Sequence, residues 1–257
     1  MRHEGAGFWR IIAGLALFGI AFGYLEASVV VYLRSIYTPL RSQLHPLVSG
    51  NEIFPLISFD QLRAFGPEHV VRLRIELGRE FSTLAMLAAV AIVAARNFRQ
   101  WIAAFIICFG VWDITFYAFL KLLVGWPASL FTWDILFLLP VPWTGPVLAP
   151  ILVSISIVAA GVLVLWREDQ GEPYVISPLR WLFIVAGGVI VLISFMIDFR
   201  HVASGGLPHP FHWALFLTGE AIGIIAFAIG IHRSSFATRS NPPSQLLQAS
   251  ESEAQSR

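Results

Sequence analysis

Cysteine is almost absent from this 257-residue sequence, in which Cys108 is the only one. A single cysteine excludes an intramolecular disulfide and a metal cluster built from thiolates. Lysine is equally scarce, since Lys121 stands beside sixteen arginines, a bias typical of a GC-rich bacterial genome. The net charge at pH 7 is only +1, which gives no reason to expect nucleic acid as a partner. We also find no motif typical of a quinone, haem or nucleotide site.

Charged residues are scarce as well, at 13%, whereas hydrophobic residues make up 57% of the chain. Both values lie far from those of soluble domains, so the lipid bilayer is the solvent that we expect around most of this protein. The first apolar stretch runs from Ile11 to Leu33. It is longer than the apolar part of a signal peptide and ends at no small-residue cleavage site. We interpret it as a retained membrane helix.

Six apolar segments reach the length of about 20 residues that a helix needs to cross a bilayer. They cover residues 9–33, 77–95, 101–124, 147–166, 181–199 and 213–231, and tryptophans stand at several of their ends. A seventh apolar piece, 129–139, is too short to cross and is followed by Pro140. The predicted fold class is therefore an all-α integral membrane bundle of six transmembrane helices plus one short re-entrant or interfacial helix.

We expect residues 1–233 to form a single transmembrane domain with a long outer loop over 35–66. The second helix is predicted to begin at Pro67, because proline suits the first helical turn. Residues 234–257 lack apolar periodicity and are expected to form a disordered cytoplasmic tail. Arginines are spread over the short connections on the side of the two termini, which favours a bacterial inner (plasma) membrane protein with both termini in the cytoplasm.

Ionisable residues within the apolar segments gather toward the side opposite the termini. A charge near the middle of a membrane helix costs about 2.5–3.5 kcal/mol, so such residues need a partner or a water-filled cavity. We expect one outward-facing polar chamber that binds a small polar ligand, a lipid headgroup or a partner subunit. The residues predicted to line it are Glu26, Glu80, Asp113, Tyr117, Lys121, Asp134 and Glu220.

Helical periodicity supports the individual assignments. Glu26 follows Gly19 and Gly23 on one face, where two small residues four apart let another helix approach closely. Glu80 is predicted to face the bundle, whereas Glu76 is predicted to form a solvated ion pair with Arg72 on turns that project from the membrane.

One face of the third segment carries an acid, a phenol and the only lysine. Asp113, Tyr117 and Lys121 are spaced four residues apart. They could relay a proton or hold an anionic group, or they could form ion pairs within the bundle. A further alternative is a structural subunit of a larger complex, with the nine tryptophans and the proline-rich segment 140–150 as its partner surface.

Histidines surround a Gly-Gly turn near the fifth and sixth segments. The residues in question are Asp198, His201, His209 and His212. Imidazoles and a carboxylate are ligands that suit Zn²⁺, so the alternative function is a metal-dependent intramembrane hydrolase that acts on a lipid. In that case Glu220 or Glu26 would be the general base. The spacing matches no compact zinc motif, and histidines at a membrane surface also commonly bond loop backbone.

Two runs, 23–34 and 126–150, resemble those of an uncharacterised bacterial polytopic membrane protein family of no known activity. A more distant analogy is with intramembrane hydrolases related to ceramidases and adiponectin receptors. That resemblance implies metal ligands at Ser194, Asp198, His201, His209 and His212. The chain departs from it in having six spans rather than seven and two residues, not three, between His209 and His212. The sequence therefore assigns no enzymatic activity.

Overall fold

Six long apolar helices make up most of the computed structural model, which describes residues 4–48, 52–172 and 176–240. They are α1 (Glu4–Leu44), α3 (Pro67–Ala94), α4 (Phe98–Val124), α5 (Leu148–Asp169), α6 (Pro178–Met196) and α8 (Trp213–Ser240). Each is long and apolar enough to cross a membrane. The predicted all-α membrane bundle with six spans is confirmed.

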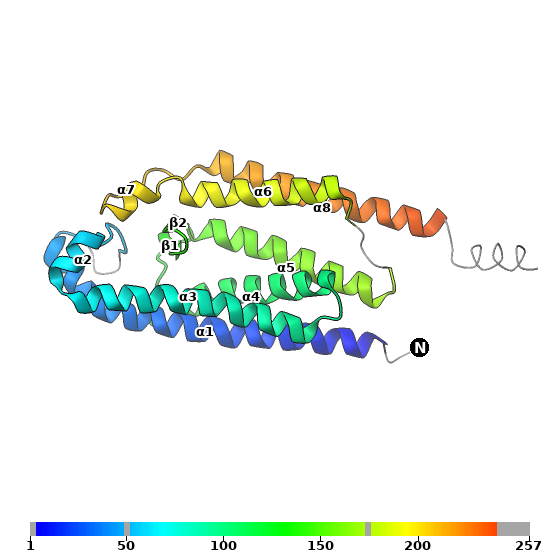
Figure 1. Cartoon of the computed structure of the whole chain (residues 1–257), viewed down its shortest axis with the longest axis horizontal. Helices are drawn as coiled ribbons and strands as arrows, with labels where there is room; N and C mark the ends of the chain where they lie inside the picture. Colours follow the sequence, from blue (N-terminus) through cyan, green and yellow to red (C-terminus); the bar gives the residue numbers. More distant parts are fainter. Residues whose placement is uncertain (1–3, 49–51, 173–175, 241–257) are drawn as a thin grey trace, which may run out of the picture.

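Both ends of the described chain lie at one end of the bundle (Figure 1). The opposite end carries the short helices α2 (Phe59–Phe65) and α7 (Phe199–Ala203) and a hairpin of strands β1 (Trp133–Phe137) and β2 (Trp143–Pro146). We call this the hairpin end. α8 continues to Ser240, and the remainder of the tail predicted over 234–257 lies outside the described residues.

Local sequence signals explain several helix boundaries. α3 begins at Pro67, as predicted, directly after Gly66. Asn97 caps α4, because its side chain accepts a hydrogen bond from the backbone N–H of Gln100. α4 ends at Val124 and is followed by Gly125, whose φ of 70° is a left-handed conformation that glycine adopts without a steric penalty.

The predicted short helix over 129–139 is wrong, because this segment contains strand β1. β1 pairs with β2 in antiparallel register, with Asp134 opposite Gly145 and Ile135 opposite Thr144. Pro140 and Pro142 lack the N–H that a continuing helix requires, so the chain turns back. Pairing across the hairpin satisfies backbone groups that water would not reach in a membrane.

The segment 35–66, predicted as a long outer loop, is partly helical, because α1 continues to Leu44 and α2 occupies Phe59–Phe65. Hydropathy identifies only the part of a helix that suits lipid. The first apolar segment, predicted over 9–33, therefore stops short of the end of α1 at Leu44. In the part of α1 beyond that segment, the centre of the Tyr37 ring lies 6.2 Å from that of His69 on α3.

The helices pack in two groups that meet at the hairpin end. α1 packs on α4, which also contacts α3 and α5, whereas α6 packs chiefly on α8 (Figure 1). Buried Leu15, Leu87, Ile107 and Cys108 form the core of the first group. The predicted close approach at Gly19 is confirmed, since a Cβ atom there would lie 2.8 Å from Cγ1 of Val111 on α4.

Two glycines set the distance between α6 and α8. A Cβ atom on Gly187 would lie 2.6 Å from the carbonyl oxygen of Gly219, and one on Gly219 would lie 2.7 Å from the carbonyl oxygen of Gly187. Backbone therefore touches backbone at this crossing, as is common where membrane helices pack through small residues.

Replacing Gly187 by alanine is expected to force α6 and α8 apart and to lower the free energy of unfolding by about 1–3 kcal/mol. The matched control is Gly188→Ala, because no atom lies within 4 Å of a Cβ at Gly188. Its effect should stay within about 0.5 kcal/mol. Thermal unfolding of the two variants in mild detergent measures the difference, and equal melting temperatures would contradict the close packing.

Candidate functional site

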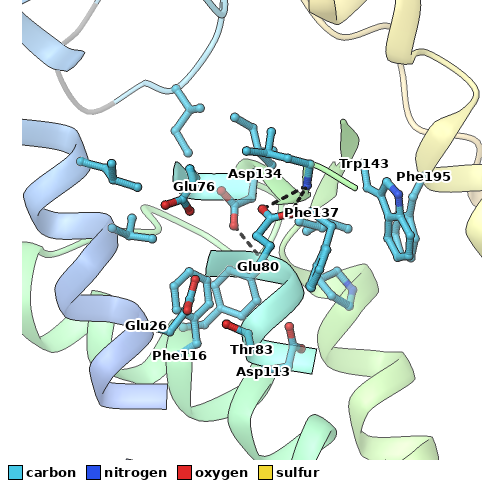
Figure 2. A pocket seen from close by; sticks show the side chains of 18 of the residues that line it. Glu26, Glu76, Glu80, Thr83, Asp113, Phe116, Asp134, Phe137, Trp143 and Phe195 are labelled. Carbon is cyan, nitrogen blue, oxygen red and sulfur yellow. Dashed lines mark hydrogen bonds between the residues drawn. The ribbon is translucent and has the colours of Figure 1, made fainter. Parts of the chain in front are cut away.

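A partly open cavity of about 440 Å³ lies at the hairpin end, between α1, α3, α4, α5, α6 and β1. Five of the seven residues predicted to line a chamber do line it: Glu26, Glu80, Asp113, Tyr117 and Asp134. Figure 2 shows the acidic side chains beside the rings of Phe116, Phe137 and Trp143. We call this cavity the chamber.

The other two predicted residues do not line the chamber. Lys121 donates hydrogen bonds to the carbonyl oxygens of Gly125 at 3.1 Å and Pro127 at 2.8 Å, so it stabilises the turn after α4. Glu220 lies on α8, where its Oε1 atom is buried without a hydrogen-bond partner among the described residues. The prediction that these two residues line the chamber is therefore wrong.

An ion-paired arginine holds α1 and α3 together at the chamber wall. Arg79 forms salt bridges with Glu26 on α1 and with Glu76 on its own helix. Its Nε atom also lies 3.0 Å from both carboxylate oxygens of Glu76. The three side chains are only 13–24% exposed, so the prediction of a solvated ion pair is wrong for Glu76.

Two further carboxyl groups are held by neutral donors. Glu80 accepts the backbone N–H of Leu138 at 2.9 Å, which ties the hairpin to α3 (Figure 2). Asp113 on α4 accepts the hydroxyl of Ser154 on α5 at 2.8 Å. Both contacts place a carboxyl group in the chamber wall without an ion-pair partner of its own among the described residues.

Asp134 lies at the hairpin between membrane helices and is 5% exposed. It accepts a hydrogen bond from the hydroxyl of Tyr117 at 3.0 Å. Burial raises the pKa of Asp134 from an ordinary 3.8 to about 6, although the Tyr117 hydrogen bond and the charge of Arg34 favour the ionised form. The Arg34 guanidinium itself lies 4.1 Å from the ring centre of Trp126, in a cation–π contact.

Several lining residues were not predicted from the sequence. Arg79 shares the polar face of Glu76 and Glu80, so helical spacing could have revealed it. Arg34 lies eight residues after Glu26, on the same face of α1. Ser154 gave no signal, because neither it nor Ser156 in the same apolar segment shows from the sequence which helix it faces. Further lining residues with polar groups are Tyr37, Thr38, Arg41, Glu52, Thr83, Trp112 and Trp143.

Three buried donor atoms of the chamber wall have no hydrogen-bond partner among the described residues. They are Nε1 of Trp112, Nε1 of Trp143 and Nη2 of Arg34. Trp112 is only 7% exposed, so bulk solvent does not satisfy its indole N–H. A buried donor without an acceptor is costly, and a molecule inside the chamber would supply one.

The predicted metal ligands lie apart from the chamber. Asp198 accepts hydrogen bonds from the backbone N–H and from Nδ1 of His209, both at 2.8 Å. The rings of His201 and His209 lie 4.3 Å apart, whereas His212 is exposed and Ser194 donates to the carbonyl of Val191. Over residues 4–48, 52–172 and 176–240, no three His, Cys, Asp or Glu side chains are arranged to hold a metal ion.

No protein-family model, curated protein or solved structure matches this chain. The resemblance of residues 23–34 and 126–150 to an uncharacterised bacterial family stays a prediction. The function must therefore be inferred from the chamber itself.

The raised pKa of Asp134 predicts a dependence of stability on pH. Because folding favours the protonated carboxyl, its contribution is complete below pH 3.8 and is lost as the pH rises through about 6. A shift of this size corresponds to about 3 kcal/mol. The melting temperature of the wild type should therefore fall relative to that of Asp134→Asn between pH 4 and 7. Exposed Asp60→Asn is the control, and a pH-independent difference for Asp134→Asn would contradict the prediction.

Removing the guanidinium of Arg79 should leave two carboxylates in the chamber wall without their cation. We expect Arg79→Leu to lower the free energy of unfolding by about 3–5 kcal/mol. Adding Glu26→Gln and Glu76→Gln to this variant should restore much of the loss, because no uncompensated charge remains. Exposed Arg74→Leu on the same helix serves as the control. Equal melting temperatures for Arg79→Leu and Arg74→Leu would refute the role of the ion pairs.

Proposed function

We propose that this protein binds a small amphipathic ligand, such as a molecule with a lipid-like headgroup, in the chamber at its hairpin end. The observation that carries the proposal is a cavity of about 440 Å³ with both apolar walls and ionisable side chains. Pockets for small molecules commonly measure about 300–1,000 Å³ and place a few polar groups in an apolar wall. The chamber fits both descriptions.

The polar groups in the chamber support a binding role over a purely structural one. A structural ion pair needs only its own partners, as Arg79 has in Glu26 and Glu76. The indole N–H groups of Trp112 and Trp143 instead have no acceptor in the part of the chain that the structure describes. Such donors are satisfied by water or by a bound molecule.

One wall of the chamber favours entry from the bilayer. Leu192 lines the chamber and is also 37% exposed on the membrane-spanning helix α6. A ligand with an apolar body could therefore reach the charged groups without first leaving the lipid. If the termini are cytoplasmic, as the arginine distribution favours, the chamber faces the outer side of a bacterial inner membrane.

The metal-dependent hydrolase is less well supported. Both carboxylate oxygens of Asp198 are engaged by His209, and this pair lies outside the chamber. Docking of a partner subunit remains an alternative occupant of the same end of the molecule. The size and enclosure of the chamber favour a small molecule over a protein segment.

Native mass spectrometry of the protein released from mild detergent tests this function. We expect a bound small molecule on the wild type, and about tenfold lower occupancy on Leu192→Trp, because the larger side chain projects into the chamber. The matched control is Ile193→Trp, since Ile193 is 47% exposed and does not line the chamber. Equal occupancy in both variants, or none in the wild type, would contradict the proposal.

A further inference from the structure

We propose that the ligand of the chamber is an amphipathic organic cation, an amine or quaternary ammonium compound with an apolar body. This inference rests on the proposed function, because it names the chemical class of the ligand at the same site. Three features carry it: the balance of charge in the wall, the way in which the existing charges are paired, and the aromatic lining.

The wall of the chamber carries more acidic than basic groups. Its three guanidinium groups belong to Arg34, Arg41 and Arg79. Its six carboxyl groups belong to Glu26, Glu52, Glu76, Glu80, Asp113 and Asp134. None of the described lining residues is a lysine or a histidine. The formal charge of the wall is therefore negative, which favours a cationic ligand.

The three arginines already interact with particular acids. Arg79 forms ion pairs with Glu26 and Glu76. The charge of Arg34 acts on Asp134, and that of Arg41 attracts Glu52. Each cation of the wall is therefore engaged by at least one acid of the wall.

Glu80 and Asp113 both accept hydrogen bonds from neutral donors. The charge of Arg79 reaches Glu80, but the hydrogen bond that Glu80 accepts comes from the neutral Leu138 N–H. Asp113 accepts only the hydroxyl of Ser154, and the charge that acts on it is that of another acid, Asp134. A carboxylate in a low-dielectric site is stabilised by a nearby cation, and a ligand would provide one.

Aromatic rings line the same cavity as these two acids. The aromatic residues of the wall are Tyr37, Phe109, Trp112, Phe116, Tyr117, Phe137, Trp143 and Phe195. The faces of such rings carry partial negative charge and attract organic cations, above all quaternary ammonium groups. A divalent metal ion instead requires several oxygen ligands around one point, and no three His, Cys, Asp or Glu side chains of the described residues are arranged to hold one. The lining thus favours an organic cation over a metal ion.

The buried indole N–H of Trp112 is a separate observation that supports a bound ligand. Trp112 is 7% exposed, lines the chamber and precedes Asp113 in the chain, and its Nε1 has no acceptor among the described residues. A hydroxyl or carbonyl oxygen on the ligand would satisfy this donor while the cationic group lies near Glu80 and Asp113. The site therefore suits an amine that also carries one polar oxygen.

Three probes of similar size and different charge test the assignment. They are benzyltrimethylammonium, its uncharged carbon isostere neopentylbenzene, and the anion benzylphosphonate. Equilibrium dialysis of the full chain in the uncharged detergent dodecyl maltoside, against empty micelles, measures their affinities at neutral pH. We expect the cation to bind at least about tenfold more tightly than either of the other probes.

Variants then connect the preference to the proposed acids. Asp113→Asn and Glu80→Gln should each weaken binding of the cation about tenfold and leave neopentylbenzene unaffected, because each keeps the acceptor oxygen and removes the charge. Glu80→Gln carries the test if Asp113→Asn does not fold. Exposed Asp60→Asn is the control for a general change in charge. Leu192→Trp should weaken the binding of both benzyltrimethylammonium and neopentylbenzene.

The outcomes separate the two proposals. If neopentylbenzene or benzylphosphonate binds as tightly as the cation, and Leu192→Trp weakens that binding, the cation assignment is overturned and the chamber remains a ligand site. Binding of the cation that is insensitive to the acid variants overturns the assignment as well. If no probe binds, or if Leu192→Trp changes no affinity, both proposals are overturned.

Discussion

The guanidinium of Arg79, shared by Glu26 and Glu76, is the contact on which the hairpin end of this protein depends. Charges are costly in a membrane-spanning bundle, so they persist only where partners compensate for them. This ion-paired group joins α1 to α3 and lets the wall of a cavity carry charge. Three further acids of the chamber, Glu80, Asp113 and Asp134, are each held by a neutral donor.

The hairpin of β1 and β2 completes the chamber because two acids hold it to the helices. Glu80 accepts the Leu138 N–H, and Asp134 accepts the Tyr117 hydroxyl. The α6–α8 pair then provides the remaining wall through Val191, Leu192 and Phe195. Since this pair packs closely on itself through Gly187 and Gly219, it meets the other helices mainly at their hairpin ends. The cavity lies where these groups meet.

Much of the fold could be predicted because a membrane restricts the choice of structure. Long apolar runs predict helices, and the six spans follow from their number. Pro67 also revealed where α3 begins. The hairpin and the extended end of α1 could not be predicted in this way. Hydropathy reports preference for lipid, whereas the hairpin depends on backbone pairing across Asp134–Gly145, and the end of α1 brings Tyr37 beside His69 of α3.

The sequence by itself determined that the chain is a six-span membrane bundle and that the ionisable residues within its apolar segments gather toward one end, since both follow from the cost of polar groups in lipid. Helical spacing was enough to identify Glu26, Glu80 and Asp113. Only the tertiary structure decided which groups meet. It placed Glu76 and Ser154 at the chamber and directed Lys121 to a turn. The physical reason is that periodicity defines the face of one helix, whereas a site depends on how several helices are rotated against one another.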